Sequence, residues 1–189
     1  MSDPEKRAIL RIGDALRLDR AHRRRLRRRS IAIAVLIGAL GLTLTAPIRP
    51  LLVWNATPSA PVGLYAISAP QDVSKGDMVI AHLSPPWRTL ADARRYVPAS
   101  VPVVKRVAAA PGDTVCARRN AIFIDGRRRA TRRLSDGQGR LMPWWQGCTA
   151  LREGALFLLN DDPASFDGRY IGPTQRGDVV GRAHFIWSR

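Results

Sequence analysis

A serine in a loop bracketed by prolines is the first residue whose type and setting could do chemistry. Ser59 lies in the stretch Asn-Ala-Thr-Pro-Ser-Ala-Pro-Val-Gly-Leu-Tyr, between Pro58 and Pro61. Each proline fixes its own φ and biases the residue before it towards extended backbone. We therefore expect the backbone around Ser59 to be rigid and extended. The same composition is also typical of a rigid linker between two parts of a chain.

A lysine inside an apolar run is the second candidate. Lys105 belongs to the run Val-Pro-Val-Val-Lys-Arg-Val-Ala-Ala-Ala. In a strand, Lys105 shares one face with Val103 and Val107. If that face is buried, desolvation lowers the pKa of the amine, and a neutral amine can take a proton from a serine hydroxyl group. The alternative is a charge on an edge strand that discourages aggregation.

The residues before Ser59 indicate how the rest of the chain is held. Residues 1–29 are strongly basic and contain interspersed apolar residues, which allows an amphipathic helix on anionic lipid. Residues 30–46 are apolar and uncharged, at the short end for a transmembrane helix. We expect an uncleaved membrane anchor, with a buried core helix and a cleaved signal peptide as alternatives. The cluster Arg23–Arg29 then stays cytoplasmic, and residues 50–189 lie outside as one domain.

The chain carries a formal net charge of +16 over 189 residues. A charge of that size attracts nucleic acid as well as anionic lipid or an acidic partner. Much of the basic excess precedes the anchor, and no recognised motif that reads DNA follows it. We therefore expect no nucleic acid partner.

From residue 50 onward the pattern is mainly β. Apolar stretches separated by turn residues indicate many short strands in a single unit. The expected strands cover residues 64–67, 78–83, 101–110, 114–117, 121–124, 155–159 and 178–187. Residues 84–87 are expected to form a proline-rich loop, 89–96 a short helical turn, and 127–142 an exposed hairpin or loop. The pair Trp144 and Trp145 suits a core plug, an interfacial position or a groove wall.

Cys116 and Cys148 match no zinc spacing, and the three histidines are scattered, so we expect neither a metal nor a cofactor. In an oxidising compartment a disulfide between the two cysteines is the simplest interpretation. In the cytosol they would be two small buried residues.

Four blocks, in order along the chain, resemble the bacterial signal peptidase I superfamily. They are Thr-Pro-Ser-Ala-Pro (57–61), Gly-Asp-Met-Val (76–79), Lys-Arg-Val-Ala-Ala-Ala-Pro-Gly-Asp (105–113) and Asn-Asp-Asp-Pro-Ala-Ser-Phe-Asp-Gly-Arg-Tyr (160–170). Residues 177–183 also resemble that superfamily. Pro-Val-Gly-Leu-Tyr (61–65) and residues 165–173 look most like the conjugative-transfer TraF peptidases, which process pilin precursors. In place of the Ser-Met-x-Pro of general signal peptidases, this chain has Ser-Ala-Pro, which points to the narrower branch.

The resemblance implies a β-sheet or barrel catalytic domain behind one N-terminal transmembrane helix. It implies that Ser59 is the nucleophile and Lys105 its general base. The backbone N–H of Ser59 and the hydroxyl group of Thr57 would form the oxyanion hole. The matched positions of the last block are Ser165, which would orient the lysine amine, and Asp167 and Arg169, which would pair and support that loop.

The implied activity is membrane-anchored endopeptidase cleavage of a secreted precursor, after a small residue in an extended segment. The implied substrate is a conjugative pilin or another exported preprotein, and the implied partners are the inner membrane and components of a conjugative type IV secretion system. The protein would span the bacterial inner membrane once, with its N-terminus cytoplasmic and its catalytic domain periplasmic. The alternatives are a general type I signal peptidase and an inactive periplasmic module that binds pilin.

Overall fold

The computed structural model describes residues 23–42 and 51–188. The chain divides into two units, Met1–Arg49 and Pro50–Arg189. In the first unit, residues 23–42 form a helix, which contains residues 30–42 of the expected anchor. Residues 43–46 of that anchor lie outside the described residues. Within the two described ranges, no helix has both the length and the apolar character needed to cross a membrane.

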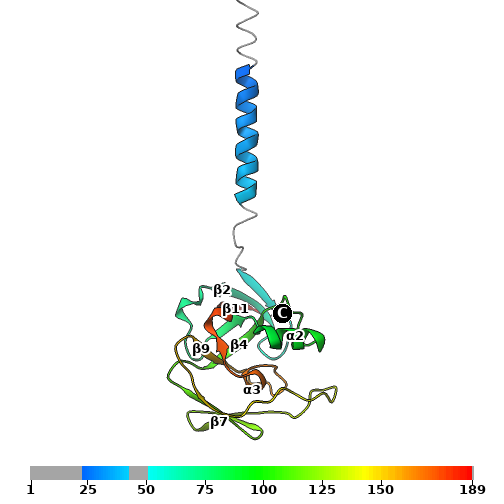
Figure 1. The fold of residues 1–189 in the computed structure, drawn as a ribbon, viewed down its shortest axis with the longest axis vertical. Coiled ribbons are helices and arrows are strands. Elements are labelled where there is room, and N and C mark those ends of the chain that lie inside the picture. The colour runs from blue at the N-terminus through cyan, green and yellow to red at the C-terminus, as the bar shows by residue number, and fades with distance from the viewer. Residues whose placement is uncertain (1–22, 43–50, 189) are drawn as a thin grey trace, which may run out of the picture. The chain divides into compact units, whose positions relative to one another are not determined.

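The second unit is built mainly from strands (Figure 1). Its strands are β1 (Leu52–Asn55), β2 (Gly63–Ser68), β3 (Met78–Ala81), β4 (Val103–Ala109), β5 (Thr114–Arg118), β6 (Ala121–Ile124), β7 (Arg127–Thr131), β8 (Gly147–Ala150), β9 (Ala155–Leu158), β10 (Thr174–Gln175) and β11 (Val179–Trp187). Its helices are α2 (Pro85–Ala93), α3 (Gly168–Ile171) and two short 3₁₀ helices, Pro70–Asp72 and Arg176–Asp178. The expected mainly β class is therefore confirmed.

The strands form two antiparallel sheets. The larger sheet has seven strands in the order β1-β2-β11-β3-β4-β9-β10, and the smaller has four in the order β7-β6-β5-β8. In the larger sheet β4 lies between β3 and β9, with Lys105 opposite Val79. In the smaller sheet Cys116 lies opposite Cys148, and the two are joined by a disulfide. A core cluster of buried side chains joins residues of both sheets, including Val115 and Phe157.

Two glycines allow close approaches that bring functional segments into place. A Cβ atom on Gly63 would lie 2.2 Å from the carbonyl oxygen of Trp187, so glycine lets β11 pass beside the start of β2. A Cβ atom on Gly168 would lie 2.7 Å from the carbonyl oxygen of Leu158, so glycine lets α3 pack against β9. Both contacts fix loops that precede or follow candidate site residues.

The local structure differs from expectation at one segment and contains two elements that were not expected. The proline-rich segment 84–87 is not a loop, because α2 begins at Pro85. Proline is tolerated in the first turn of a helix, where its missing N–H would have no intrahelical partner. Strand β8 was not expected, and it forms by pairing with β5. Helix α3 was not expected either, and it lies inside the polar segment 160–172.

The two adjacent tryptophans have different surroundings. Trp145 packs against the core cluster around Phe157, and its indole N–H donates a hydrogen bond to the carbonyl oxygen of Gly168 at 3.1 Å. Trp144 lies at the surface, with the guanidinium group of Arg132 3.8 Å from its ring centroid. Of the three expected roles, Trp145 therefore has that of a core plug.

Candidate active site

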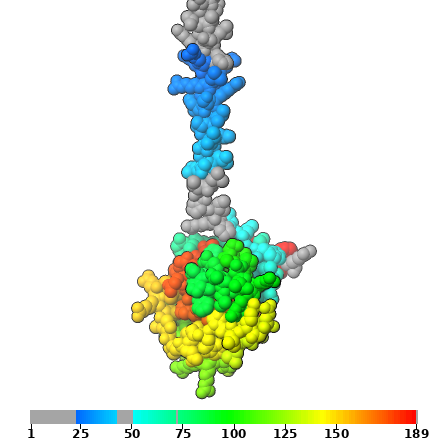
Figure 2. All heavy atoms as spheres, turned by 45° about the vertical axis from the view of Figure 1, so that its right-hand side comes forward, coloured from blue at the N-terminus to red at the C-terminus, as the bar shows by residue number. Residues whose placement is uncertain are grey.

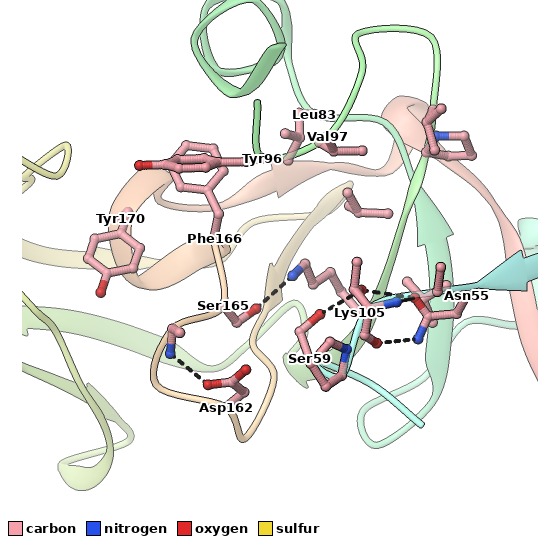
Figure 3. A pocket seen from close by; sticks show the side chains of 18 of the residues that line it. Asn55, Ser59, Leu83, Tyr96, Val97, Lys105, Asp162, Ser165, Phe166 and Tyr170 are labelled. Atoms are coloured by element: carbon pink, nitrogen blue, oxygen red, sulfur yellow. Dashed lines mark hydrogen bonds between the residues drawn. The ribbon is translucent and has the colours of Figure 1, made fainter. Parts of the chain in front are cut away.

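A cavity of about 520 Å³ brings together the residues that the sequence singled out for chemistry. Its walls come from the loop between β1 and β2, from β4, and from the segment that precedes α3. Thr57, Ser59, Lys105 and Ser165 all line it. Figure 3 shows the side chains of Ser59, Lys105 and Ser165 facing one region of this cavity.

Ser59 lies in the tight loop between β1 and β2, and Asn55 holds that loop. The amide nitrogen of Asn55 donates hydrogen bonds to the carbonyl oxygens of Thr57, Ala60 and Pro61, at 2.9, 3.1 and 3.1 Å. Its amide oxygen accepts from the backbone N–H and from the hydroxyl group of Thr57, at 3.3 and 3.0 Å. One buried side chain therefore fixes the loop on both sides of the serine.

The backbone at Ser59 is a turn, which corrects the extended conformation expected from the prolines. The reason is the set of bonds to Asn55, which draws three carbonyl groups of the loop towards one amide nitrogen. The residue preferences of proline act on single φ and ψ angles, whereas these side-chain bonds act on the whole loop. A sign of this could have been found in the sequence, since asparagine at the start of a loop often bonds to backbone two residues on.

The hydroxyl group of Thr57 connects Asn55 to Ser59. It donates to the amide oxygen of Asn55 and lies 3.3 Å from the hydroxyl oxygen of Ser59. A hydroxyl group has one proton, so while Thr57 donates to Asn55 it can only accept from Ser59. The backbone N–H of Ser59 makes no hydrogen bond to any described residue, so it is available to a ligand in the cavity.

Lys105 is buried in the middle of β4, with 5% of its surface exposed, as the alternation of the strand predicts. Its amine donates a hydrogen bond of 2.6 Å to the hydroxyl oxygen of Ser165. Burial lowers the pKa of the Lys105 amine to about 8; the negative charges of Asp167 and Asp162 oppose this shift, and Arg169 adds to it. Within the described residues, Lys105 and Ser59 share no hydrogen bond.

Asn160 fixes β4 on both sides of Lys105. Its amide oxygen accepts from the backbone N–H of Arg106 at 3.0 Å, and its amide nitrogen donates to the carbonyl oxygen of Val104 at 3.1 Å. The backbone N–H of Asn160 in turn donates to the carboxylate of Asp167 at 3.0 Å. Sequence reasoning had placed Asn160 only at the start of a polar block, with no role.

Asp167 and Arg169 form a buried ion pair behind the cavity wall. The guanidinium group of Arg169 donates to both carboxylate oxygens of Asp167, at 2.8 and 3.1 Å, and also to the carbonyl oxygen of Asn160. Asp167 caps the start of α3 by accepting from the backbone N–H of Arg169. Neither residue lines the cavity, so the pair acts by holding the segment that carries Ser165.

The predicted residues thus fall into three groups. Ser59, Thr57, Lys105 and Ser165 meet at the cavity, and Asp167 and Arg169 support it from behind. Cys116 and Cys148 lie in the four-stranded sheet and do not line the cavity. Within the described part of the chain, no group of three or more His, Cys, Asp or Glu side chains is arranged to hold a metal ion.

Comparison with known proteins places the chain among peptidases. Residues 25–188 match the family described as signal peptidase, peptidase S26. Two plasmid transfer proteins TraF from Escherichia coli are each 34% identical over 139 residues. These alignments cover 67% and 66% of this chain and 77% and 76% of the relatives.

Among solved structures, a signal peptidase I from Enterococcus faecalis is 21% identical, with a TM-score of 0.35. That match covers 61% of this chain and 98% of the other. The family match spans most of the chain and includes every residue placed at the cavity. The chain therefore belongs to the signal peptidase S26 family.

Proposed function

We propose that this protein is a membrane-anchored serine endopeptidase in which Ser59 is the nucleophile and Lys105 the general base. The observation that carries the proposal is the burial of Lys105 in the cavity that Ser59 lines. A lysine with a pKa of about 8 is partly neutral near physiological pH, so its amine can accept a proton. Membership of the signal peptidase S26 family supports the same chemistry.

The reaction is acyl transfer in two steps. The neutral amine of Lys105 takes the proton of the Ser59 hydroxyl group, and the serine oxygen attacks the carbonyl carbon of the scissile peptide bond. The ammonium group then gives its proton to the departing amine, and an acyl-enzyme remains. Water, or an amine where the product is cyclised, attacks the acyl-enzyme and restores Ser59. Ser165 orients the amine of Lys105 through the 2.6 Å hydrogen bond.

The oxyanion that forms in each step needs donors at the cavity. The unpaired backbone N–H of Ser59 is one donor, and the hydroxyl group of Thr57 is the other. Because Thr57 donates to Asn55 at rest, its hydrogen turns from Asn55 to the oxyanion as negative charge develops. A donor of this kind contributes on the order of 3 kcal/mol to transition-state stabilisation.

The substrate we propose is an exported precursor, and specifically a conjugative pilin. Two relatives are named plasmid transfer protein TraF, and the resemblance to the TraF peptidases implies a pilin precursor as substrate. We also propose that residues 30–46 anchor the protein in the inner membrane and that the domain is periplasmic. Exposed apolar side chains at the ends of β1 and β11, Trp54 and Trp187 among them, suit a position at the membrane surface.

Mass spectrometry of the pilin from strains with and without active protein tests the proposal. Ser59→Ala and Lys105→Ala should each leave the precursor uncleaved, while the matched controls Ser100→Ala and Lys75→Ala should process it normally. Ser100 and Lys75 are exposed and do not line the cavity. Processing that persists in both active-site variants would instead indicate a non-catalytic module that binds pilin.

A further inference from the structure

The cavity is larger than the four reactive residues require, and its remaining part has a distinct character. Beyond Ser165 it opens into a lobe whose walls are the rings of Tyr96, Phe166 and Tyr170 and the side chains of Leu83 and Met142. In Figure 3 Phe166 continues from Ser165 on the side away from Ser59, with Tyr96 beside it. We call these five side chains the aromatic lobe.

The rings of the aromatic lobe are fixed in place. The centroids of Tyr96 and Phe166 are 5.3 Å apart, and those of Phe166 and Tyr170 are 6.3 Å apart. Phe166, Tyr170 and Leu83 belong to one buried cluster with Ala91 of α2. The walls of the lobe are therefore held in place by contacts with one another and with α2.

The hydroxyl groups of the two tyrosines are already paired with the protein. That of Tyr96 donates to the carboxylate of Asp136 at 2.6 Å, and that of Tyr170 accepts from the backbone N–H of Arg133 at 3.0 Å. The ring faces, rather than the hydroxyl groups, are thus what the lobe offers to a ligand. Aromatic faces favour bulky apolar side chains, because such a contact removes apolar surface from water.

A hairpin over residues 134–142 forms the outer wall of the lobe. It is closed by hydrogen bonds between Met142 and Leu134 and between Asp136 and Arg140. Asp136 also accepts from the guanidinium group of Arg140 at 2.7 Å, and the hydrogen bonds from Tyr96 and Arg140 hold the pKa of its carboxyl group below its usual range. The guanidinium group of Arg94, just after α2, donates to the carbonyl oxygen of Leu141 at 2.9 Å.

These bonds tie the hairpin to the end of α2. Figure 2 shows the α2 region, in green, against the segment around this hairpin, in yellow, at the surface. The hairpin is therefore held beside the lobe by Asp136, a polar anchor that itself lines the cavity. This arrangement is typical of a specificity pocket, whose walls are rigid and whose rim is charged.

We propose that the aromatic lobe is a specificity subsite that binds one bulky apolar side chain, Leu, Met, Phe or Trp, of the precursor close to the scissile bond. The inference rests on the proposed peptidase function and adds to it a substrate class: an extended segment with a bulky apolar residue near its cleavage position. The hairpin 134–142 sets the size of the residue that fits.

Cleavage of a proteome-derived peptide library by the full-length protein in detergent, read by mass spectrometry, tests the proposal. We expect bulky apolar residues to be enriched at one position near the cleaved bond. Leu83→Trp and Met142→Trp each add bulk to a wall of the lobe and should replace that preference by Gly and Ala. Two variants are used because either one alone could fail to fold. Phe123→Leu, in the four-stranded sheet, should keep the preference.

Two outcomes of this experiment would overturn the subsite: cleaved peptides with no preference for bulky residues, or the same preference in both filled variants. A second measurement separates this failure from failure of the proposed function. We would titrate the Ser59→Ala protein, by calorimetry, with ten-residue Ala/Ser peptides that carry one Phe or none. Phe should tighten binding about tenfold, and Leu83→Trp should remove the difference.

The binding experiment gives a result even if the wild-type protein cleaves nothing. In that case, tighter binding of the peptide with Phe would retain the subsite and reject the peptidase function. Equal binding of the peptides with and without Phe would reject the subsite. If the wild-type protein cleaves peptides without any preference, the subsite alone is rejected.

Discussion

At the scale of single residues, Lys105 combines a cost to folding with a gain in reactivity. The seven-stranded sheet buries its amine, and the single hydrogen bond to Ser165 replaces the water that an exposed ammonium group would bind. Desolvation disfavours the charged form, which is why the pKa of the amine falls to about 8. In the function we propose, the lowered pKa lets Lys105 act as a base. The same burial makes the ammonium form of Lys105 destabilise the fold.

The pH dependence of activity should follow the titration of Lys105. Below pH 8 most of the amine is protonated and cannot accept a proton, so kcat/KM should rise with pH and level off above about 8. Peptide cleavage measured between pH 5.5 and 9.5 checks this. A profile without a rise over that range would exclude a lysine base with this pKa.

Lys105→Met should abolish activity and stabilise the fold. A folded-state pKa of about 8, lowered from 10.5, means that at pH 7 the buried ammonium group destabilises the folded state by about 3 kcal/mol. Between those two pKa values the unfolded chain binds more protons than the folded one, so wild-type stability rises with pH. We expect Lys105→Met to gain about 1–3 kcal/mol at pH 7 and to lack that rise.

Urea unfolding at pH 7 and at pH 9.5 measures both effects. The matched control is Lys75→Met, which removes an exposed lysine that pairs with Asp113 at 2.9 Å, and it should give no gain in stability. Equal stability of Lys105→Met and wild type at both pH values would contradict the assigned cost of burial.

Asn55→Ala should lower kcat/KM about a hundredfold, although Asn55 takes no part in the reaction itself. The variant removes the five hydrogen bonds that Asn55 makes to the loop around Ser59 and leaves the one from Tyr65 to the carbonyl oxygen of Pro61. Peptide cleavage assays at pH 9.5, where most of Lys105 is neutral, reduce the contribution of the titration of the base. Asn120→Ala, which changes an exposed asparagine between β5 and β6, is the control and should keep near-wild-type activity.

At the scale of elements, the two sheets divide their tasks. The residues that line the reactive part of the cavity lie on β4, on the loop between β1 and β2, and before α3, all tied to the seven-stranded sheet. The four-stranded sheet carries the disulfide and leads into the hairpin 134–142, which lines the cavity but carries none of the proposed reactive residues. We therefore expect the smaller sheet to affect stability more than the chemical step.

Replacing both Cys116 and Cys148 by serine tests this division. The chain-entropy argument gives about 3–4 kcal/mol for a cross-link that spans 32 residues, and its loss should lower Tm by roughly 10 °C. We expect kcat/KM at 20 °C to change little. Thermal melts with and without dithiothreitol provide the check, because only the wild type should respond to the reductant. A variant with an unchanged Tm would mean that the disulfide adds no stability.

The features that could be predicted from the sequence are those with a local hydrophobic pattern, and the features that were missed have none. The burial of Lys105 followed from alternation in β4, because a strand places every second side chain on one face. Strand β8 has no apolar alternation, and all four of its residues are exposed, so only its pairing with β5 makes it a strand. The roles of Asn55 and Asn160 were also missed, because hydrophobic periodicity does not encode which backbone groups a side-chain amide will reach.

At the scale of the whole molecule, the function we propose depends on where the domain works. A pilin precursor crosses or spans the inner membrane, so a peptidase that cleaves it is best held at that membrane. The basic cluster Arg23–Arg29 and the uncharged segment 30–46 supply an orientation signal and an apolar stretch in sequence order. A periplasmic domain also agrees with a disulfide, because that compartment is oxidising.

Topology is therefore the prediction that concerns the molecule as a whole. In spheroplasts, an added protease should degrade an epitope tag at the C-terminus of the full-length protein while cytoplasmic markers stay intact. Replacing Arg27, Arg28 and Arg29 by Glu should reduce this accessibility, since positive charge retains the N-terminus in the cytoplasm. The matched control replaces Arg127, Arg128 and Arg129 of β7 by Glu, an equal change of charge within the domain, and should leave the tag accessible. A wild-type tag that is protected until the spheroplasts are lysed would place the domain in the cytoplasm and reject the proposed access to an exported pilin.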